Sequence, residues 1–519
     1  MFWPTMRWSA RIFGLALAAG GKEVPGITGK SPGFSRRTGT GPLENSCVHR
    51  LGWTSVWVFW RNCAGKFVEK VRDRRICQRS ESWLDVGSMR WFLKDSVLRG
   101  WLWILGLLPG VGLLFWSSYP LSRRLGLILM GLVAFGGFAW ARLRLDRTLQ
   151  GQSNWNLPGQ IYRLLSCPLD LFMVVQLVAA RGAAEGHWMG GPGFMWVGPV
   201  WYSAHAIVFF GYLFGGTGRR LWGLLRRSSR GSVPAVSPER RRFLEGSVVA
   251  AAGIPFAISL SGVGTSYDFQ VEEREIYLPN WPRSLDGLRV AHLSDIHVGG
   301  AMDAIRLQRV ADLTNQAKPD IVMHTGDFLT HRDGDFDAPL YPALAKIQAP
   351  LGQWACRGNH DFDDPIGFPR KLGEAGVNLL RDEQATLKFA GEEVRVGGLD
   401  YVGRDRDRAQ AYAANTRGMG PHDGEPRILL LHDPSQWLHV PTGASNLVLS
   451  GHTHGGHIGI PWGQGALWTV VGAAGFPDQG VFMRDDETRL YVTRCVGFYG
   501  YPLRLGIPPE IAMLNLRSA

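Results

Sequence analysis

Short apolar runs alternate with stretches of helical periodicity in the second half of the chain, from about Gly264 onward. Apolar runs this short, bounded by turn residues, are typical of buried strands. They predict strands at Leu288–Leu293, Ile321–His324, Gln353–Cys356, Val394–Val396, Ile428–Leu431 and Asn446–Leu449. Between the first two, Ala304–Gln316 repeats its apolar positions at the spacing of a helix face. This alternation predicts an α/β fold for the second half.

The first half has a different pattern, in which uncharged apolar stretches approach the roughly 20 residues that a membrane-spanning helix needs. Four stretches qualify as spans: Gly100–Leu121, Leu125–Ala141, Gly186–Gly218 and Gly246–Ser261. A fifth, Leu164–Ala180, includes Asp170, so the prediction stays at four or five crossings. A soluble helical bundle is the alternative, but it explains neither the richness in Trp and Gly nor the scarcity of acidic residues. We therefore expect an α-helical transmembrane region.

The segment before these spans shows no sustained hydrophobic period. Met89 begins a stretch that looks like a natural start ahead of the first span. We hypothesise that residues 1–88 are a disordered leader or an upstream translation artefact. The predicted organisation is this leader, a transmembrane region over residues 89–263 and an α/β domain over residues 264–519.

Charge divides the chain at the same place. The formal net charge is +12, yet residues 264–519 hold 24 Lys and Arg against 32 Asp and Glu, so the positive charge belongs to the first half. An enzyme that cleaves nucleic acid carries basic residues around its active site. The acidic second half therefore argues against nucleic acid as a partner, whereas a basic first half suits a lipid bilayer.

Basic loops set the expected orientation, because cytoplasmic loops are enriched in Lys and Arg. The most basic loop is Arg219–Arg242, which is therefore expected in the cytoplasm. Arg123 and Arg124 argue against this orientation, because it places their short loop outside. Arg240–Leu244, followed by an apolar run, also resembles a twin-arginine export signal, with a plain positive cluster before a helix as the alternative. Both interpretations predict a multi-pass protein of the inner (plasma) membrane with its second half on the extracytoplasmic side.

Five loops of the second half, each following a predicted strand, carry Asp, Asn or His. They are Ser294–His297, Gly326–Asp327, Gly358–Asp361, His432–Asp433 and Gly451–His454. Loops at the ends of strands in α/β sheets project side chains into a shared crevice. Carboxylate oxygen combined with imidazole nitrogen suits two divalent ions such as Mn, Fe or Zn, and the absence of Cys from these loops disfavours a structural zinc site.

In their order, DxH, GD, GNHD, H and GHTH, these motifs resemble those of the calcineurin-like metallophosphoesterases over about Leu288–His457. HDP at His432–Pro434, GHTHGG at Gly451–Gly456 and PLRLG from Pro502 are similar to the membrane-associated bacterial branch of that family, although His457 stands where that branch usually has Gln. The resemblance implies a four-layer α/β sandwich of two mixed sheets covered by helices. The strands alone are equally compatible with a doubly wound sheet.

Site roles also follow from the resemblance, position by position. It implies a first metal held by Asp295, His297, Asp327 and His454, and a second held by Asp327, Asn359, His432 and His452. Asp327 would bridge the two, and a hydroxide between them would attack phosphorus. His360 would be the catalytic general acid, or would stabilise charge on the phosphoryl group.

Several nearby residues have weaker expectations. Asp361 and Asp433 adjoin the site and are expected to orient ligands. His457 is left open between a contact with substrate and an ordinary structural role. Arg357 suits either a phosphate or a structural salt bridge. A disulfide between Cys356 and Cys495 is left open.

The resemblance implies hydrolysis of a phosphate ester or phosphoanhydride. A membrane anchor beside an acidic domain favours a phosphate-containing lipid or a cell-envelope substrate. UDP-diacylglucosamine hydrolases resemble this chain, but their substrate is cytoplasmic, which the predicted orientation opposes. The alternative is a catalytically silent membrane sensor or scaffold that binds a nucleotide or a partner through the same domain.

Overall fold

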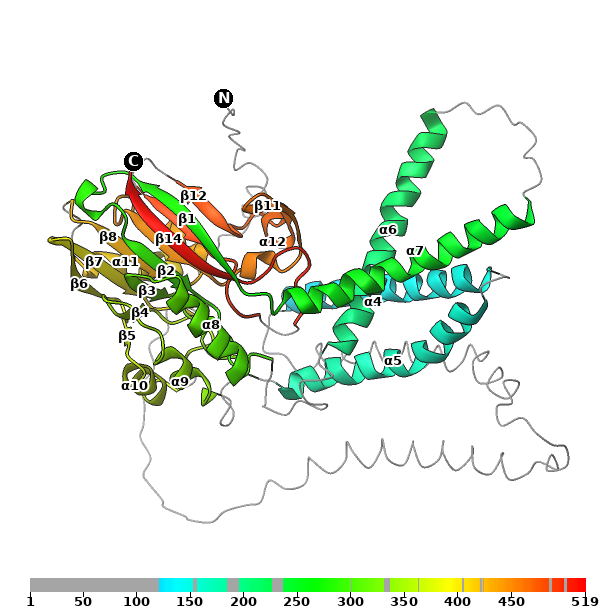
Figure 1. Cartoon of the computed structure of the whole chain (residues 1–519), viewed down its shortest axis with the longest axis horizontal. Helices are drawn as coiled ribbons and strands as arrows, with labels where there is room; N and C mark the ends of the chain where they lie inside the picture. The colour runs from blue at the N-terminus through cyan, green and yellow to red at the C-terminus, as the bar shows by residue number, and fades with distance from the viewer. Residues whose placement is uncertain are drawn as a thin grey trace, which may run out of the picture. The chain divides into compact units, whose positions relative to one another are not determined.

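The structure is a computed structural model that describes residues 121–152, 156–183, 196–225 and 237–519, apart from 300, 331–336, 363, 404–405, 421, 423, 485–487 and 499–501. The expected leader and nearly all of the first expected span lie outside the described residues. The other expected spans fall in four long helices (Figure 1): α4 (Leu121–Gln150), α5 (Asn156–Ala183), α6 (Val197–Leu225) and α7 (Pro238–Thr265). In the described residues, Val197–Gly216 and Pro238–Thr265 are long and apolar enough to cross a membrane.

These helices pack through aromatic side chains. Phe138 of α4, Tyr162 of α5 and Trp201 of α6 belong to one buried cluster, against which Phe256 of α7 packs. Asp170 lies in α5 beside an apolar run, and its carboxylate forms a 2.5 Å ion pair with Arg142. A partner of opposite charge is what allows a carboxylate to stay in such surroundings.

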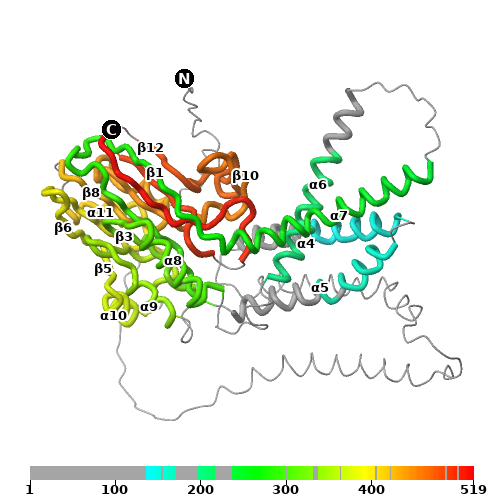
Figure 2. Tube along the Cα trace, viewed as in Figure 1, coloured from blue at the N-terminus to red at the C-terminus, as the bar shows by residue number. Residues whose placement is uncertain are grey.

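The second half contains two six-stranded sheets. In the first, the strand order is β1 (Gln270–Leu278), β14 (Glu510–Ser518), β2 (Arg289–Leu293), β3 (Ile321–His324), β4 (Gln353–Ala355) and β5 (Val377–Leu379). In the second, it is β12 (Gly480–Met483), β13 (Arg489–Val492), β9 (Leu447–Ser450), β8 (Arg427–Leu431), β7 (Glu392–Leu399) and β6 (Glu383–Phe389). The C-terminal strand β14 runs parallel to β1, the first strand after α7 (Figure 2).

The two sheets pack face to face, and helices cover their outer faces. Alternation along β8 makes this plain: Ile428 and Leu430 join the core between the sheets, whereas Leu429 and Leu431 join the core beneath the outer helices. The helical segments that complete the domain are α8 (Ala304–Gln316), α9 (Leu340–Leu344), α10 (Gly367–Glu374), α11 (Arg408–Gly418), α12 (Val470–Ala473) and the 3-10 turns η1 (Arg283–Leu285), η3 (Pro434–His439) and η4 (His454–Gly456). The expected four-layer sandwich is confirmed.

The six predicted strands correspond to β2, β3, β4, β7, β8 and β9, and the predicted helix is α8. Strands β2, β3 and β4 are mutually parallel, as are β7, β8 and β9. The loops at their carboxyl ends carry the expected chemical residues. A separate two-stranded hairpin, β10 (Gly459–Trp462) and β11 (Gly465–Thr469), follows the last of these loops.

Candidate metal centre

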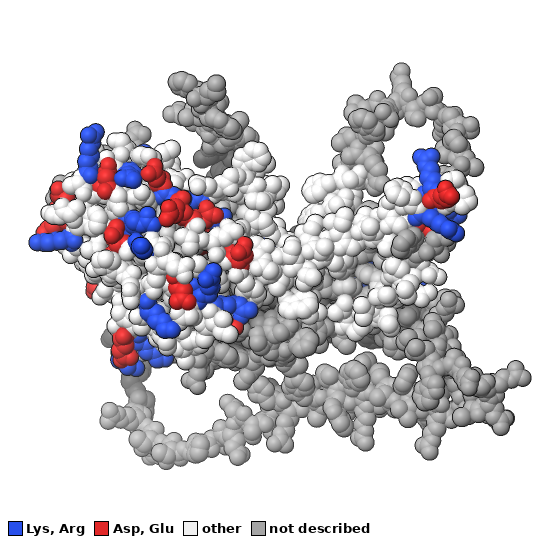
Figure 3. All heavy atoms as spheres, viewed as in Figure 1, with Lys and Arg blue, Asp and Glu red and all other residues white. Residues whose placement is uncertain are grey.

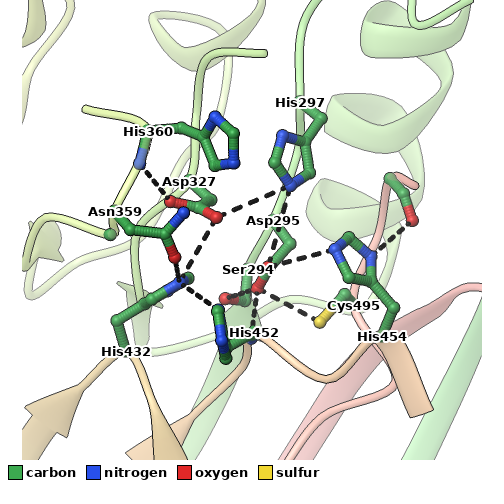
Figure 4. A network of polar contacts seen from close by, with 12 residues as sticks. Ser294, Asp295, His297, Asp327, Asn359, His360, His432, His452, His454 and Cys495 are labelled. Atoms are coloured by element: carbon green, nitrogen blue, oxygen red, sulfur yellow. Dashed lines mark hydrogen bonds and ion pairs between the residues drawn. The ribbon is translucent and has the colours of Figure 1, made fainter. Parts of the chain in front are cut away.

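The seven expected ligands and His360 converge at the ends of β2, β3, β4, β8 and β9 (Figure 4). His297 Nε2 lies 3.6 Å and His432 Nε2 lies 3.3 Å from Asp327 Oδ2. On the other side, His454 Nε2 lies 3.3 Å from Asp295 Oδ1. Two carboxylates at the centre are thus surrounded by imidazoles.

The outer members of this group lie on its half-buried side. Asn359 Oδ1 is 3.1 Å and His452 Nδ1 is 3.0 Å from His432 Nε2. Asp295, His297, Asp327, His432 and His454 are buried, whereas Asn359, His360 and His452 are partly exposed. Substrate must therefore approach from the side of these three residues.

Backbone carbonyls fix the orientation of three imidazoles. The Nδ1 atoms of His297, His432 and His454 lie 3.1, 2.7 and 3.3 Å from the carbonyl oxygens of Leu329, Thr325 and Gly497. With Nδ1 donating a proton to a carbonyl, Nε2 is the nitrogen of each ring that faces the central carboxylates. This pattern of outer hydrogen bonds is typical of metal-binding histidines.

The donor set fits divalent cations. Within the described residues, buried Asp295 Oδ1 accepts no hydrogen bond, a deficit that a cation would remove. Burial lowers the pKa of His297 to about 4, so that ring is neutral near pH 7, as metal binding requires. Burial also lowers the pKa of His432, but the carboxylates of Asp327 and Asp295 outweigh it and raise that pKa to about 10. In the metal-free chain a proton at His432 thus balances negative charge that cations would otherwise balance.

Backbone strain is concentrated here. The residues with φ between 49° and 66° include five of the expected ligands: Asp295, His297, Asp327, His452 and His454. Left-handed φ is uncommon for residues other than Gly, and it clusters at functional sites. Beside them, a Cβ atom on Gly451 would overlap Ser294 Oγ and Asp295 Oδ2, so only glycine fits that position.

Asp361 holds two of the loops together. Its fully buried carboxylate accepts backbone N–H groups of Asp327 (2.7 Å), Phe328 (2.9 Å), Leu329 (3.3 Å) and Gly358 (2.9 Å). Burial and the nearby Asp327 raise the pKa of Asp361 to about 7. Asp433 caps η3, because its Oδ1 accepts the Ser435 N–H at 3.0 Å.

Sequence reasoning missed Cys495 and the role of Arg504. The Cys495 thiol lies 3.1 Å from Asp295 Oδ2, and burial raises its pKa well above the usual value, so it donates as a neutral thiol. Cys495 and Cys356 are both free. Buried Arg504 donates to the carbonyls of His454 (3.2 Å), Arg494 (3.0 Å) and Cys495 (3.3 Å), and to those of Ile507 and Gly497. The sequence held one signal for each residue. Cys495 follows β13, a strand that was not predicted, and Arg504 belongs to the PLRLG motif.

Geometry decides the alternative left open for Arg357. Arg357 forms an ion pair with Asp400 and stacks on the Phe362 ring at 4.0 Å, which is the structural role. His457 has its ring 4.9 Å from that of His454, with Nδ1 3.3 Å from the Leu503 carbonyl. His360 has its ring 5.1 Å from that of His297 and its Nδ1 3.1 Å from the Thr330 carbonyl.

Comparison with known proteins agrees with this geometry. Residues 288–456 match the model of the calcineurin-like phosphoesterase family. The chain is 29% identical to a transmembrane protein with metallophosphoesterase domain from Danio rerio, over 60% of this chain and 71% of that protein. It is 28% identical to the uncharacterized metallophosphoesterase YkuE of Bacillus subtilis, over 54% of this chain and 98% of that protein.

A third relative has a named substrate. The UDP-2,3-diacylglucosamine pyrophosphatase LpxG of Chlamydia trachomatis is 25% identical over 46% of this chain and 86% of that protein. Relatives named transmembrane proteins and the two apolar helices together indicate membrane association. The sheets, the converging acidic and imidazole side chains and the match over residues 288–456 show that the second half of the chain carries a calcineurin-like phosphoesterase domain and is a phosphoric ester hydrolase; proteins of this family use divalent metals.

Proposed function

We propose that the second half of the chain is a membrane-anchored phosphoesterase with two metal ions, and that its substrate is a lipid-linked or cell-envelope phosphate ester or phosphoanhydride. This proposal rests on the convergence of two carboxylates and four imidazoles. Each of these side chains is oriented by an outer hydrogen bond or by strained backbone. Such a set of oxygen and nitrogen donors suits Mn, Fe or Zn.

The proposed ligands of one ion are Asp295, His297, Asp327 and His454, and those of the other are Asp327, Asn359, His432 and His452. Asp327 suits a shared ligand because its Oδ2 lies near both His297 (3.6 Å) and His432 (3.3 Å). When bound, the ions supply Lewis-acid chemistry and activation of the nucleophile.

His360 is proposed as the catalytic proton donor. Its backbone N–H donates to Asp327 Oδ1 at 2.8 Å, which ties the residue to the centre of the site. Its Nδ1 faces the Thr330 carbonyl, so Nε2 is the nitrogen that exchanges a proton with substrate. Its partial exposure suits a group that meets the leaving oxygen on the open side.

The membrane part of the proposal rests on the apolar helices and on the relatives' names. A candidate span, Pro238–Thr265, ends directly before the catalytic domain, so the site stays close to the lipid surface. One relative is named a diacylglucosamine pyrophosphatase, which supports a lipid-linked substrate class. We further propose the inner membrane, several crossings and an extracytoplasmic catalytic domain, as the basic loops predict.

The full chain in detergent tests the activity. Hydrolysis of p-nitrophenyl phosphate and bis-p-nitrophenyl phosphate is measured with Mn, Fe, Zn or no metal, for the wild type, Asp327→Ala and the control Asp312→Ala on the exposed side of α8. We expect metal-dependent turnover that Asp327→Ala abolishes and Asp312→Ala retains. A folded, metal-loaded chain without turnover on these or on lipid-linked phosphates would favour the silent sensor.

The leaving group tests His360. Phenyl phosphate needs protonation of its leaving oxygen more than p-nitrophenyl phosphate does. If His360 is the proton donor, His360→Ala lowers turnover of the phenyl ester more strongly than that of the nitrophenyl ester. An equal loss on both would instead indicate charge stabilisation.

A further inference from the structure

The catalytic domain carries an exposed apolar surface beside the metal centre. We call it the hairpin surface, and it consists of Ile460, Trp462, Leu467, Trp468, Val470 and Phe476. The exposed fraction is 73% for Trp462 and 69% for Leu467. Clusters of this kind on soluble proteins usually mark an interaction site.

No Lys, Arg, Asp or Glu occurs between Pro434 and Pro477, a stretch that contains the whole hairpin. On the face drawn in Figure 3, charged side chains gather over the sheets, whereas the part that carries the hairpin is white. A two-stranded sheet alone is marginally stable in water. Within the described residues no other strand joins the sheet of β10 and β11, so a cover for their apolar side chains would stabilise them.

The base of the hairpin adjoins the end of a candidate membrane span. Gly459 N–H donates to the Leu505 carbonyl at 2.9 Å, and the neighbouring Arg504 N–H donates to the Gly262 carbonyl in the last turn of α7, also at 2.9 Å. Apolar side chains of α7 are exposed as well, including Ile254 (55%) and Leu260 (52%). Exposed apolar side chains thus occur both on the helix and on the hairpin whose base adjoins its last turn.

We propose that the hairpin surface docks onto the lipid bilayer, next to the point where α7 leaves it. Trp side chains are enriched at membrane interfaces, where an apolar ring meets a polar N–H, and two of the six residues are Trp. A bilayer suits this surface better than a protein partner because the base of the hairpin adjoins the end of a candidate span. The docked hairpin also turns the neighbouring loop of His452 and His454 towards lipid headgroups.

Site-directed spin labelling of the full chain in phosphatidylcholine–phosphatidylglycerol nanodiscs tests the proposal. Cysteines are introduced as Trp462→Cys, Leu467→Cys and Phe476→Cys, with Ile366→Cys (81% exposed) and Leu438→Cys (71% exposed) as apolar controls away from the hairpin. Cys47, Cys63, Cys77 and Cys167 are replaced by Ser, whereas buried Cys356 and Cys495 remain. The midpoint of thermal unfolding checks that each variant is folded.

We expect the ratio of oxygen to nickel-complex accessibility to be several-fold higher at the hairpin labels than at the controls. Labels as open to the nickel complex as the controls would overturn the proposal. Immobilised labels that exclude both reagents would overturn it too, and would identify a protein contact such as a second copy of the chain. The readout needs no turnover, so it is independent of the proposed hydrolysis.

Discussion

The backbone N–H of Arg504 donates a 2.9 Å hydrogen bond to the carbonyl of Gly262, in the last turn of α7. The side chain of the same residue donates to the carbonyl of His454, a proposed metal ligand. One arginine therefore joins the end of a candidate membrane span to the backbone of the metal centre. Its guanidinium is fully buried, and burial lowers its pKa to about 10.

Arg504→Lys should loosen the metal centre. Three N–H donors replace the five of a planar guanidinium, so some of the carbonyls around it lose their partner. We expect the metal concentration for half-maximal turnover to rise by about 10-fold or more, the usual scale for a lost outer hydrogen bond. Metal titration of the activity measures this. Arg517→Lys, at a half-exposed ion pair with Glu275, is the control and should leave the titration unchanged.

Asp361→Asn should weaken both folding and metal binding. The amide nitrogen would face backbone N–H groups that now donate to a carboxylate oxygen, leaving buried donors unsatisfied at a cost of about 1–3 kcal/mol each. Thermal unfolding and metal titration measure the two effects. Exposed Asp364, whose Oδ1 accepts the Gly367 N–H at 2.7 Å, gives the control Asp364→Asn. Equal stability of the two variants would contradict the role assigned to Asp361.

Gly451→Ala should be severely disruptive, because its methyl group would overlap Ser294 Oγ and Asp295 Oδ2. We expect a loss of at least about 2 kcal/mol in unfolding free energy, at the upper end for overpacking. Gly373→Ala in α10 is the control, since nothing lies within 4 Å of its Cβ position. That variant should gain about 0.5–1 kcal/mol from better helix propensity. Thermal unfolding of both variants checks the difference.

Acid should destabilise the domain through His324. Burial lowers the pKa of His324 to about 4, below the unfolded value near 6.5. Between these two values the unfolded chain binds a proton that the folded chain does not, so stability falls as pH falls through that window and is unaffected above it. The slope from this one group approaches about 1.4 kcal/mol per pH unit.

The test compares chelator-treated wild type with His324→Gln from pH 7 to pH 4. Glutamine cannot titrate but can still bond Gln353, whose Oε1 lies 3.1 Å from His324 Nε2. We expect a shallower loss of stability in the variant. Parallel curves for the two proteins would exclude His324 as a source of acid sensitivity. His439→Gln, at a half-buried position, should behave as the wild type does.

The strands that position the site could be predicted because each is a short apolar run buried on both faces, as in Ile428–Leu431. The pairing of β1 with β14 could not, since Gln270 meets Glu510 across the length of the domain. β1 itself reads QVEEREIYL, and its partly exposed charges hide the strand. Tertiary pairing of this kind overrides the local pattern.

The order of the motifs was sufficient to identify the residues that meet at the proposed centre. The loops that follow neighbouring strands lie at the same edge of the sheet and bring their side chains together. Motif order could not identify Cys495, whose approach to Asp295 depends on the unpredicted strand β13. Nor could it reveal the left-handed backbone at His454, since the GHTH motif names residue types and not their φ angles. The proposed metal assignments and the membrane topology stay predictions.

The uncharged stretch from Pro434 to Pro477 bears on how this protein can be purified. A fragment cut after Thr265 would lack every candidate span and still expose Trp462 and Leu467. Such a fragment would adsorb to micelles and to chromatography resins, so removing the helices would not by itself yield a detergent-free preparation. Solubility engineering of this domain has to begin at the hairpin.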